Sequence, residues 1–282
     1  MNCLFFALKT ENNILSKNQP IGIFDSGIGG LTVANAIKKH LPNEEIIYFG
    51  DTAHLPYGDK APYSIKHYST EIAKFLLEKN CKLIVIACNT ASSIAVKDVQ
   101  KVTKGKAILV NVIDPVVETV HKQSQPGNHV GIIGTKGTIK SGVYRKKLRA
   151  LNEELNVSSM ATPLLAPMIE EGFINDKISQ TVLESYLTDK KLHAIDAIIL
   201  ACTHYPLIKD EINAFYKERV NVVDSADIVG RYVKEQLEKN DLLNDKIAPN
   251  HQFFVSDYTS SFEKSTRYFF PEKITLEKAA IW

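Results

Sequence analysis

The sequence has few cysteines, almost no net charge and no long apolar run. Four cysteines in 282 residues, at positions 3, 81, 88 and 202, are too few to stabilise a chain of this size by disulfides. We therefore expect free thiols in a reducing compartment. A net charge of +2 gives no electrostatic reason to expect nucleic acid or a membrane as partner. No apolar stretch approaches the ~20 residues of a membrane helix.

Common binding motifs are also missing. The glycines at 27, 29 and 30 do not form the dinucleotide fingerprint, and those at 131, 134 and 137 lack the Lys-Ser/Thr ending of a phosphate-binding loop. No Cys-x-x-Cys or His-x-x-x-His pattern accompanies the cysteines, so no metal is expected. The basic run at 145–149 has no interleaved aromatic residues and is interpreted as a solvated helix face.

Length and composition favour two globular domains. Hydrophobic residues make up 44% of the chain and charged residues 23%, close to the values of ordinary globular proteins. Residues 1–19 precede the first predicted strand and are expected to form an extension. Because their apolar patch has no cationic segment before it and is interrupted by Lys9 and Glu11, we do not expect a signal peptide.

Two similar stretches dominate the sequence. Residues 82–92, KLIVIACNTAS, and residues 196–206, DAIILACTHYP, each consist of a buried-type strand, then Ala-Cys, then a polar turn. Each strand would carry a thiol, Cys88 or Cys202, at its carboxyl end. Open α/β sheets keep their ligands at that edge, and a helix starting there favours a lowered thiol pKa.

The remaining pattern alternates strands with helices and repeats in its second half. Residues 22–26 align with residues 131–135, which places Asp25 opposite Gly134, and the matching cysteines follow these two residues after 63 and 68 positions. We predict two similar α/β domains with mainly parallel sheets flanked by helices, related by a pseudo-twofold axis, with the active site in the cleft between them. The predicted domains are 20–113 plus 222–282, which carries Cys88, and 114–221, which carries Cys202.

Two thiols on opposite walls of a cleft suit a two-base reaction. One thiol can remove a proton from one face of a carbon while the other returns a proton to the opposite face. Each thiol needs a partner for its proton: Asp25 is predicted to serve Cys88, and His204, polarised by Glu170, to serve Cys202. The alternatives are ordinary ones, namely buried structural cysteines, a turn-capping Asp25 and a solvated Glu170.

At this point the motifs resemble those of glutamate racemases. The resemblance spans residues 21 to about 233. The matching segments occur in the order expected for that family and are FDSGIGGLTV (24–33), YFGDTAHLPYG (48–58), ACNTAS (87–92), PMIEEG (167–172) and LACTHYPL (200–207).

The resemblance implies a cofactor-independent isomerase that interconverts L- and D-glutamate, supplying D-glutamate for peptidoglycan in a bacterial cytoplasm. It implies no metal, a small-molecule substrate and a homodimer. Catalysis is assigned to Cys88 and Cys202, assisted by Asp25, Glu170 and His204. Substrate contacts are assigned to Asp25, Ser26, Tyr57, Gly58, Asn89, Thr90, Thr203 and His204.

Three other functions stay open. An aspartate racemase of the same fold is the nearest, although such enzymes tend to carry Thr-Glu where this chain has Thr203-His204. A decarboxylase relative would have one of the two cysteines. A non-catalytic two-lobed amino-acid binder or a regulatory partner would bind glutamate without exchange of the glutamate Cα hydrogen in deuterium oxide.

Overall fold

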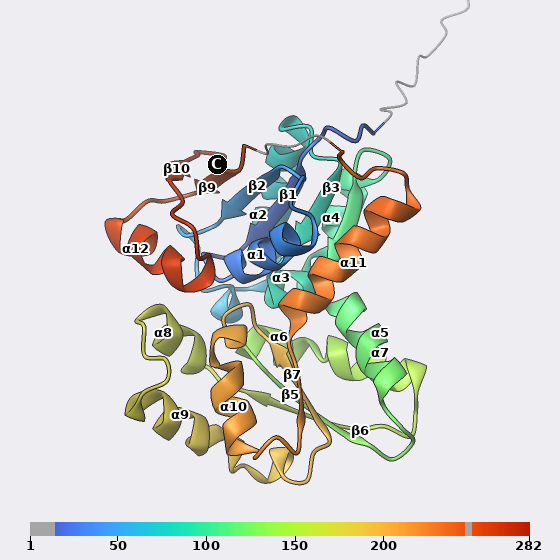
Figure 1. Ribbon diagram of the computed structural model, residues 1–282, viewed down its shortest axis with the longest axis vertical. Coiled ribbons are helices and arrows are strands. Elements are labelled where there is room, and N and C mark those ends of the chain that lie inside the picture. Colours follow the sequence, from blue (N-terminus) through green and yellow to red (C-terminus); the bar gives the residue numbers. More distant parts are fainter. Residues whose placement is uncertain (1–14, 246–249) are drawn as a thin grey trace, which may run out of the picture.

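The computed structural model describes residues 15–245 and 250–282, which form two lobes (Figure 1). Residues 1–14, most of the predicted extension, lie outside the described part. The first lobe combines the described residues up to Asn111 with the segment from Ser225 onward, so that the blue and red parts of the chain lie together in Figure 1. The green and yellow middle of the chain forms the second lobe. In the described ranges no helix is both long and apolar enough to cross a membrane.

The first lobe is built on a six-stranded parallel sheet in the order β10-β9-β2-β1-β3-β4. Its strands are β1 (Ile21–Asp25), β2 (Ile46–Gly50), β3 (Leu83–Ile86), β4 (Ile108–Asn111), β9 (Gln252–Val255) and β10 (Leu276–Lys278). Its helices are α1 (Leu31–His40), α2 (Pro62–Glu78), α3 (Asn89–Ile94), α4 (Val96–Thr103), α11 (Ser225–Lys239) and α12 (Ser260–Phe269). Short 3₁₀ turns are η1 (Tyr57–Asp59) here, and η2 (Lys190–Leu192) and η3 (Tyr205–Ile208) in the second lobe.

The second lobe is built on a four-stranded parallel sheet in the order β6-β5-β7-β8. Its strands are β5 (His129–Gly134), β6 (Asn156–Ala161), β7 (Ala197–Ala201) and β8 (Asn221–Val223). The accompanying helices are α5 (Ile113–Gln123), α6 (Lys136–Ser141), α7 (Val143–Leu151), α8 (Leu165–Glu170), α9 (Lys177–Leu187) and α10 (Lys209–Phe215). The expected domain boundary at 221/222 would divide β8, which pairs with β7 through Val223, so the chain leaves this sheet two residues later than expected.

The sheets form because their strands are apolar on both faces. Ile21 and Ile23 belong to the core on the α1 and α11 side, whereas Phe24 belongs to the core on the α2 and α4 side. A strand covered on both faces is typical of a parallel sheet with helices on each side. The fold class expected from the sequence, two α/β domains with parallel sheets, is confirmed.

Both sheets repeat one strand order, which positions the site. The order β2-β1-β3-β4 becomes β6-β5-β7-β8 when each number is raised by four. In each sheet the strands are added first on one side of the first strand and then on its other side. A crevice opens at this switch point, at the carboxyl ends of β1 and β3 in the first sheet and of β5 and β7 in the second. Cys88 follows β3 and Cys202 follows β7, so each thiol lies at one of these crevices.

Candidate active site

The two crevices face one cavity of about 230 Å³ between the lobes. Ligand pockets for drug-sized molecules measure roughly 300–1,000 Å³, so this cavity suits a smaller molecule. The first lobe lines it with Ser26, Gly27, Leu55, Pro56, Tyr57, Gly58, Cys88, Asn89 and Thr90. The second lobe contributes Thr135, Ala166, Pro167, Glu170, Cys202, Thr203 and His204.

Cys88 is the N-cap of helix α3. Its Sγ accepts a hydrogen bond from the Ala91 N–H at 3.5 Å and contacts the Ser26 hydroxyl at 3.6 Å. Burial, reinforced by the negative charge of Asp25, raises the pKa of the Cys88 thiol to about 12. The pKa lowering expected from the helix N-terminus is therefore wrong, because loss of water around the thiolate outweighs the N–H contact. Cys88 rests as a thiol, ready to donate a proton.

Cys202 has a different environment, with a titratable neighbour. Its Sγ lies 3.6 Å from Nδ1 of His204, and Nε2 of the same ring lies 2.7 Å from Oε1 of Glu170. Burial lowers the pKa of His204, but the contacts with Cys202 and Glu170 raise it, and the net pKa is well above the ordinary value. The ring can thus hold a positive charge between the sulfur and the carboxylate.

Glu170 comes from an element that the sequence did not suggest. Residues 165–170 form helix α8, which ends at Glu170. Pro167 fits there because it occupies the first turn, where no intrahelical N–H bond is lost. The helix directs Glu170 toward His204, and the side chain keeps 30% of its surface exposed.

Asp25 lies at the end of β1 and is fully buried. Its Oδ2 accepts the Gly27 N–H at 3.1 Å, and its Oδ1 lies 3.5 Å from the Thr203 hydroxyl of the second lobe. Burial raises the pKa of Asp25, while the His204 charge opposes that rise. No hydrogen bond joins Asp25 to Cys88 in the described part of the chain. Asp25 therefore acts on that thiol through its charge or through other groups.

The other residues assigned to substrate contacts lie around the cavity. Ser26, Tyr57, Gly58, Asn89, Thr90, Thr203 and His204 all line it, whereas Asp25 lies behind them and is not part of the lining. Thr135 was missed, although it aligns with Ser26 in the internal repeat and faces the same cavity. No lysine or arginine is among the lining residues, so an anionic ligand would depend on hydroxyls, amides and backbone N–H groups.

A buried carboxylate behind Tyr57 was also missed. Asp51 follows β2, and its oxygens accept from the Tyr57 hydroxyl and the Ser256 hydroxyl, each at 2.7 Å. His54 contacts the same carboxylate at 2.8 Å. Three parts of the first lobe therefore meet at Asp51 and fix the wall that Tyr57 provides.

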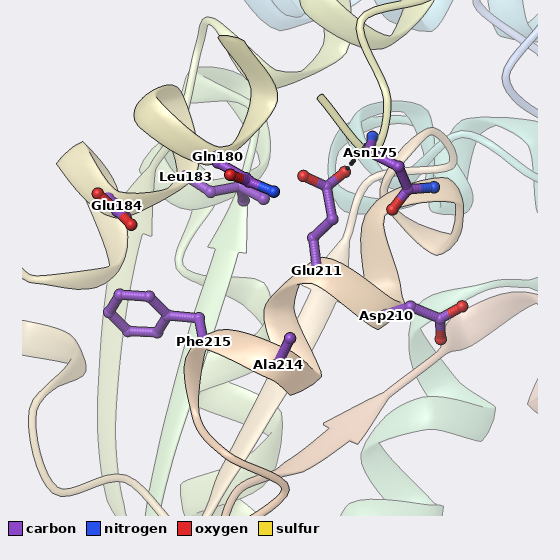
Figure 2. Close-up of a pocket in the computed structure, with 8 residues that line it drawn as sticks. All are labelled: Asn175, Gln180, Leu183, Glu184, Asp210, Glu211, Ala214 and Phe215. Carbon is purple, nitrogen blue, oxygen red and sulfur yellow. Dashed lines mark hydrogen bonds between the residues drawn. The ribbon is translucent and has the colours of Figure 1, made fainter. Parts of the chain in front are cut away.

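A larger hollow of about 400 Å³ lies elsewhere, between α9 and α10 (Figure 2). Figure 2 shows Leu183 and Phe215 on its walls and Glu211 turned toward Asn175. The Glu211 carboxylate is already engaged by the Asn175 N–H at 2.9 Å and the Ser179 hydroxyl at 2.5 Å. The hollow has neither thiol nor imidazole on its walls, so the reactive groups belong to the cavity between the lobes.

Over residues 15–245 and 250–282 no cluster of three metal-binding side chains occurs.

Comparisons with known proteins agree with this geometry. The family model of the Asp/Glu/Hydantoin racemases matches residues 31–233. The glutamate racemase of Geobacter metallireducens is 43% identical over 243 residues, covering 86% of this chain and 89% of its own. The solved glutamate racemase of Francisella tularensis, in complex with D-glutamate, superposes with a TM-score of 0.86 at 38% identity, covering 94% of this chain and 98% of its own.

A second solved structure gives the same result. The glutamate racemase isoform of Bacillus anthracis superposes with a TM-score of 0.88 at 33% identity, covering 93% of this chain and 98% of its own. Both sequence and structure thus match along nearly the whole length of these relatives. The chain belongs to the Asp/Glu/Hydantoin racemase family and groups there with the glutamate racemases.

Proposed function

We propose that this racemase interconverts L- and D-glutamate by a two-base reaction between Cys88 and Cys202 that needs no cofactor. The observation that carries the proposal is that both thiols line one cavity, each from the tip of an equivalent strand in opposite lobes. A substrate carbon held between them would expose one face to each sulfur. Related enzymes solved with bound D-glutamate or L-glutamate support the choice of substrate.

The raised pKa of the Cys88 thiol suits one direction of the proposed reaction directly. With Cys202 ionised beside the His204 imidazolium, its sulfur takes the Cα proton, and the Cys88 thiol gives its own proton to the opposite face. One C–H bond breaks and one forms, and the charge moves from Cys202 to Cys88. The reverse direction starts from that second state. Preorganised donors around the cavity would hold the negative charge that develops as the C–H bond breaks.

The proposal also covers the use of the product, the cellular location and the oligomeric state. The D-glutamate product would supply peptidoglycan synthesis in the cytoplasm of a bacterium, as the bacterial origin of the relatives suggests. We also propose a homodimer. Both thiols and the other lining residues named above come from the two lobes of a single chain.

The deciding experiment follows hydrogen exchange at Cα. Purified, chelator-treated protein is incubated with L-glutamate, and separately with L-aspartate, in deuterium oxide. Deuterium in glutamate together with loss of optical rotation supports the proposal. Exchange in aspartate alone reassigns the substrate to the sister activity. Absence of exchange in both contradicts a racemase acting on these substrates and favours an amino-acid-binding protein.

The two-thiol scheme has its own test. Cys88→Ala and Cys202→Ala should each reduce racemisation by several orders of magnitude, because a single base cannot serve both faces of the carbon. Retention of near wild-type turnover by either variant would contradict the scheme. Loss of activity on dialysis that is restored by zinc or pyridoxal phosphate would contradict the cofactor-free reaction.

A further inference from the structure

Asn89 presents an unused hydrogen-bond donor at the cavity. Its side chain is 2% exposed, and its Nδ2 is buried without a hydrogen-bond partner among the described residues. An unpaired buried donor costs about 1–3 kcal/mol, so such a group is usually completed by a ligand or water. Asn89 lines the cavity between the lobes, so this N–H₂ group belongs to a residue that a bound substrate would contact.

The other end of the same amide is held from the opposite lobe. Oδ1 of Asn89 accepts a hydrogen bond from the Tyr144 hydroxyl at 2.7 Å. Asn89 begins α3 in the first lobe, while Tyr144 lies in α7 beside the second sheet, so this bond crosses between the lobes. Tyr144 is 2% exposed, and burial raises its pKa, which keeps the hydroxyl protonated as a donor.

The hydroxyl decides which way the amide faces. Tyr144 has no second hydrogen-bond partner in residues 15–245 and 250–282. If the Asn89 amide were rotated by half a turn, its Nδ2 would donate to the Tyr144 oxygen and the hydroxyl proton would lose its acceptor. Burial makes that arrangement costly. The observed arrangement leaves Nδ2, and not Oδ1, free for the ligand.

We propose that Tyr144 is a positioning residue, which acts from the second lobe by fixing the Asn89 amide so that its N–H₂ group meets a carboxylate of the substrate. The inference rests on the proposed function and deepens it. A rotated amide would place an oxygen against the carboxylate instead. The bond from Tyr144 therefore decides whether Asn89 attracts or repels the substrate carboxylate. Because the bond spans the lobes, this donor is correctly oriented when the lobes are together.

A double-mutant cycle tests whether Tyr144 acts through Asn89. Tyr144→Phe, Asn89→Ala and the double variant are compared with wild type for KM and kcat toward glutamate. Tyr144→Phe should raise KM about tenfold with a smaller change in kcat, as expected when one hydrogen bond to a charged group is weakened. In the Asn89→Ala background the same substitution should change KM by less than about twofold, because its target is gone.

Two further variants keep the test decisive. Asn89→Asp preserves shape but places an oxygen where the N–H₂ group was, so its KM should exceed that of Asn89→Ala. Tyr216→Phe is the matched control, since it removes a hydroxyl bonded to the carbonyl of Leu192, and neither residue lines the cavity. Its KM should equal that of wild type. Urea unfolding of every variant shows which ones are folded.

The outcomes separate this inference from the proposed function. The role of Tyr144 would be overturned if the effects of Tyr144→Phe and Asn89→Ala on KM multiply in the double variant. It would also be overturned if Asn89→Asp binds glutamate as well as wild type does. If wild type shows no Cα exchange with glutamate, the proposed function fails instead. In that case the dissociation constants of glutamate for wild type, the two single variants and the double variant, measured by calorimetry, give the double-mutant cycle without any need for turnover.

Discussion

Gly29 allows the two lobes to approach at the active site. A Cβ added to it would lie 2.4 Å from Cε1 of His204 and 2.7 Å from Oγ1 of Thr203. These distances are too short for any side chain, so the glycine-rich turn gives room for the His204 ring. This packing role accounts for a motif whose spacing does not match nucleotide-binding loops.

Gly29→Ala should therefore lower kcat/KM by about 100-fold or more, since displacements of about 1 Å in a catalytic group can have that effect. The matched control is Gly27→Ala in the same turn, where the new methyl group would meet the Leu55 side chain at 3.5 Å, an ordinary contact. Its loss should be far smaller. Equal losses in both variants, measured by racemisation kinetics, would contradict the account given for Gly29.

Glu170 should control the alkaline side of the pH–rate profile. Its carboxylate helps to raise the pKa of His204, so the imidazolium persists above pH 6.5 and is lost only as the pH rises through that raised pKa. Glu170→Gln removes the charge, and the alkaline limb of kcat/KM should move to lower pH by about one unit or more. The neighbouring exposed Glu171→Gln should leave the profile in place. If the alkaline limb of kcat/KM lies at the same pH in Glu170→Gln as in wild type, this role of the carboxylate is contradicted.

The sequence predicted the residues that carry recognisable chemistry, but not those that act through them. Cys88 and Cys202 stand out because their surroundings repeat. Tyr144 and Asp51 gave no comparable signal, since a tyrosine on a helix or an aspartate in a loop has many ordinary uses. Nor could the raised pKa of Cys88 be predicted. It depends on burial under the second lobe and on the nearby Asp25, both of which require the folded chain.

Among the elements, apolar strands were easier to predict than polar ones. Strand β1 begins at Ile21 and helix α1 at Leu31, and the sequence marks both clearly with an apolar, β-branched run and a glycine turn after it. Strand β6 was not expected. Its sequence, NVSSMA, is polar, and it lies at the edge of the second sheet, where one side of the strand meets solvent.

The carboxyl ends of β2 and β9 are joined by a hydrogen bond that should contribute to stability. The Ser256 hydroxyl donates to Asp51 at 2.7 Å and accepts from the Ala53 N–H at 2.9 Å. Ser256→Ala leaves a buried carboxylate oxygen and a backbone N–H short of partners, so the free energy of unfolding should fall by roughly 1–3 kcal/mol. Urea unfolding measures the difference. Ser261→Ala, at an exposed position in α12, should change it by less than about 0.5 kcal/mol.

At the scale of the whole molecule, the two lobes share a topology but not their chemistry. Equivalent strands place Cys88 and Cys202 symmetrically, while the partners differ: Ser26 on one side, His204 with Glu170 on the other. The two thiols therefore have unlike surroundings, which suits the two unlike faces of the substrate in the proposed reaction. Buried apolar residues of both lobes form one continuous core that includes Cys202, while Cys88 belongs to the second core, on the α2 and α4 side of the first sheet.

This arrangement predicts the behaviour of mixed variants. Because both thiols of one cavity come from the same chain, Cys88→Ala and Cys202→Ala proteins cannot restore each other's activity, even if they assemble into dimers. Co-expressed and co-purified variants should stay as inactive as each variant alone. Recovery of about a quarter of wild-type racemisation, the share expected if half of the dimers formed one intact site at their interface, would show that the cavity is shared between chains. The same mixture with wild-type protein should keep activity in proportion to its wild-type content, as independent sites require.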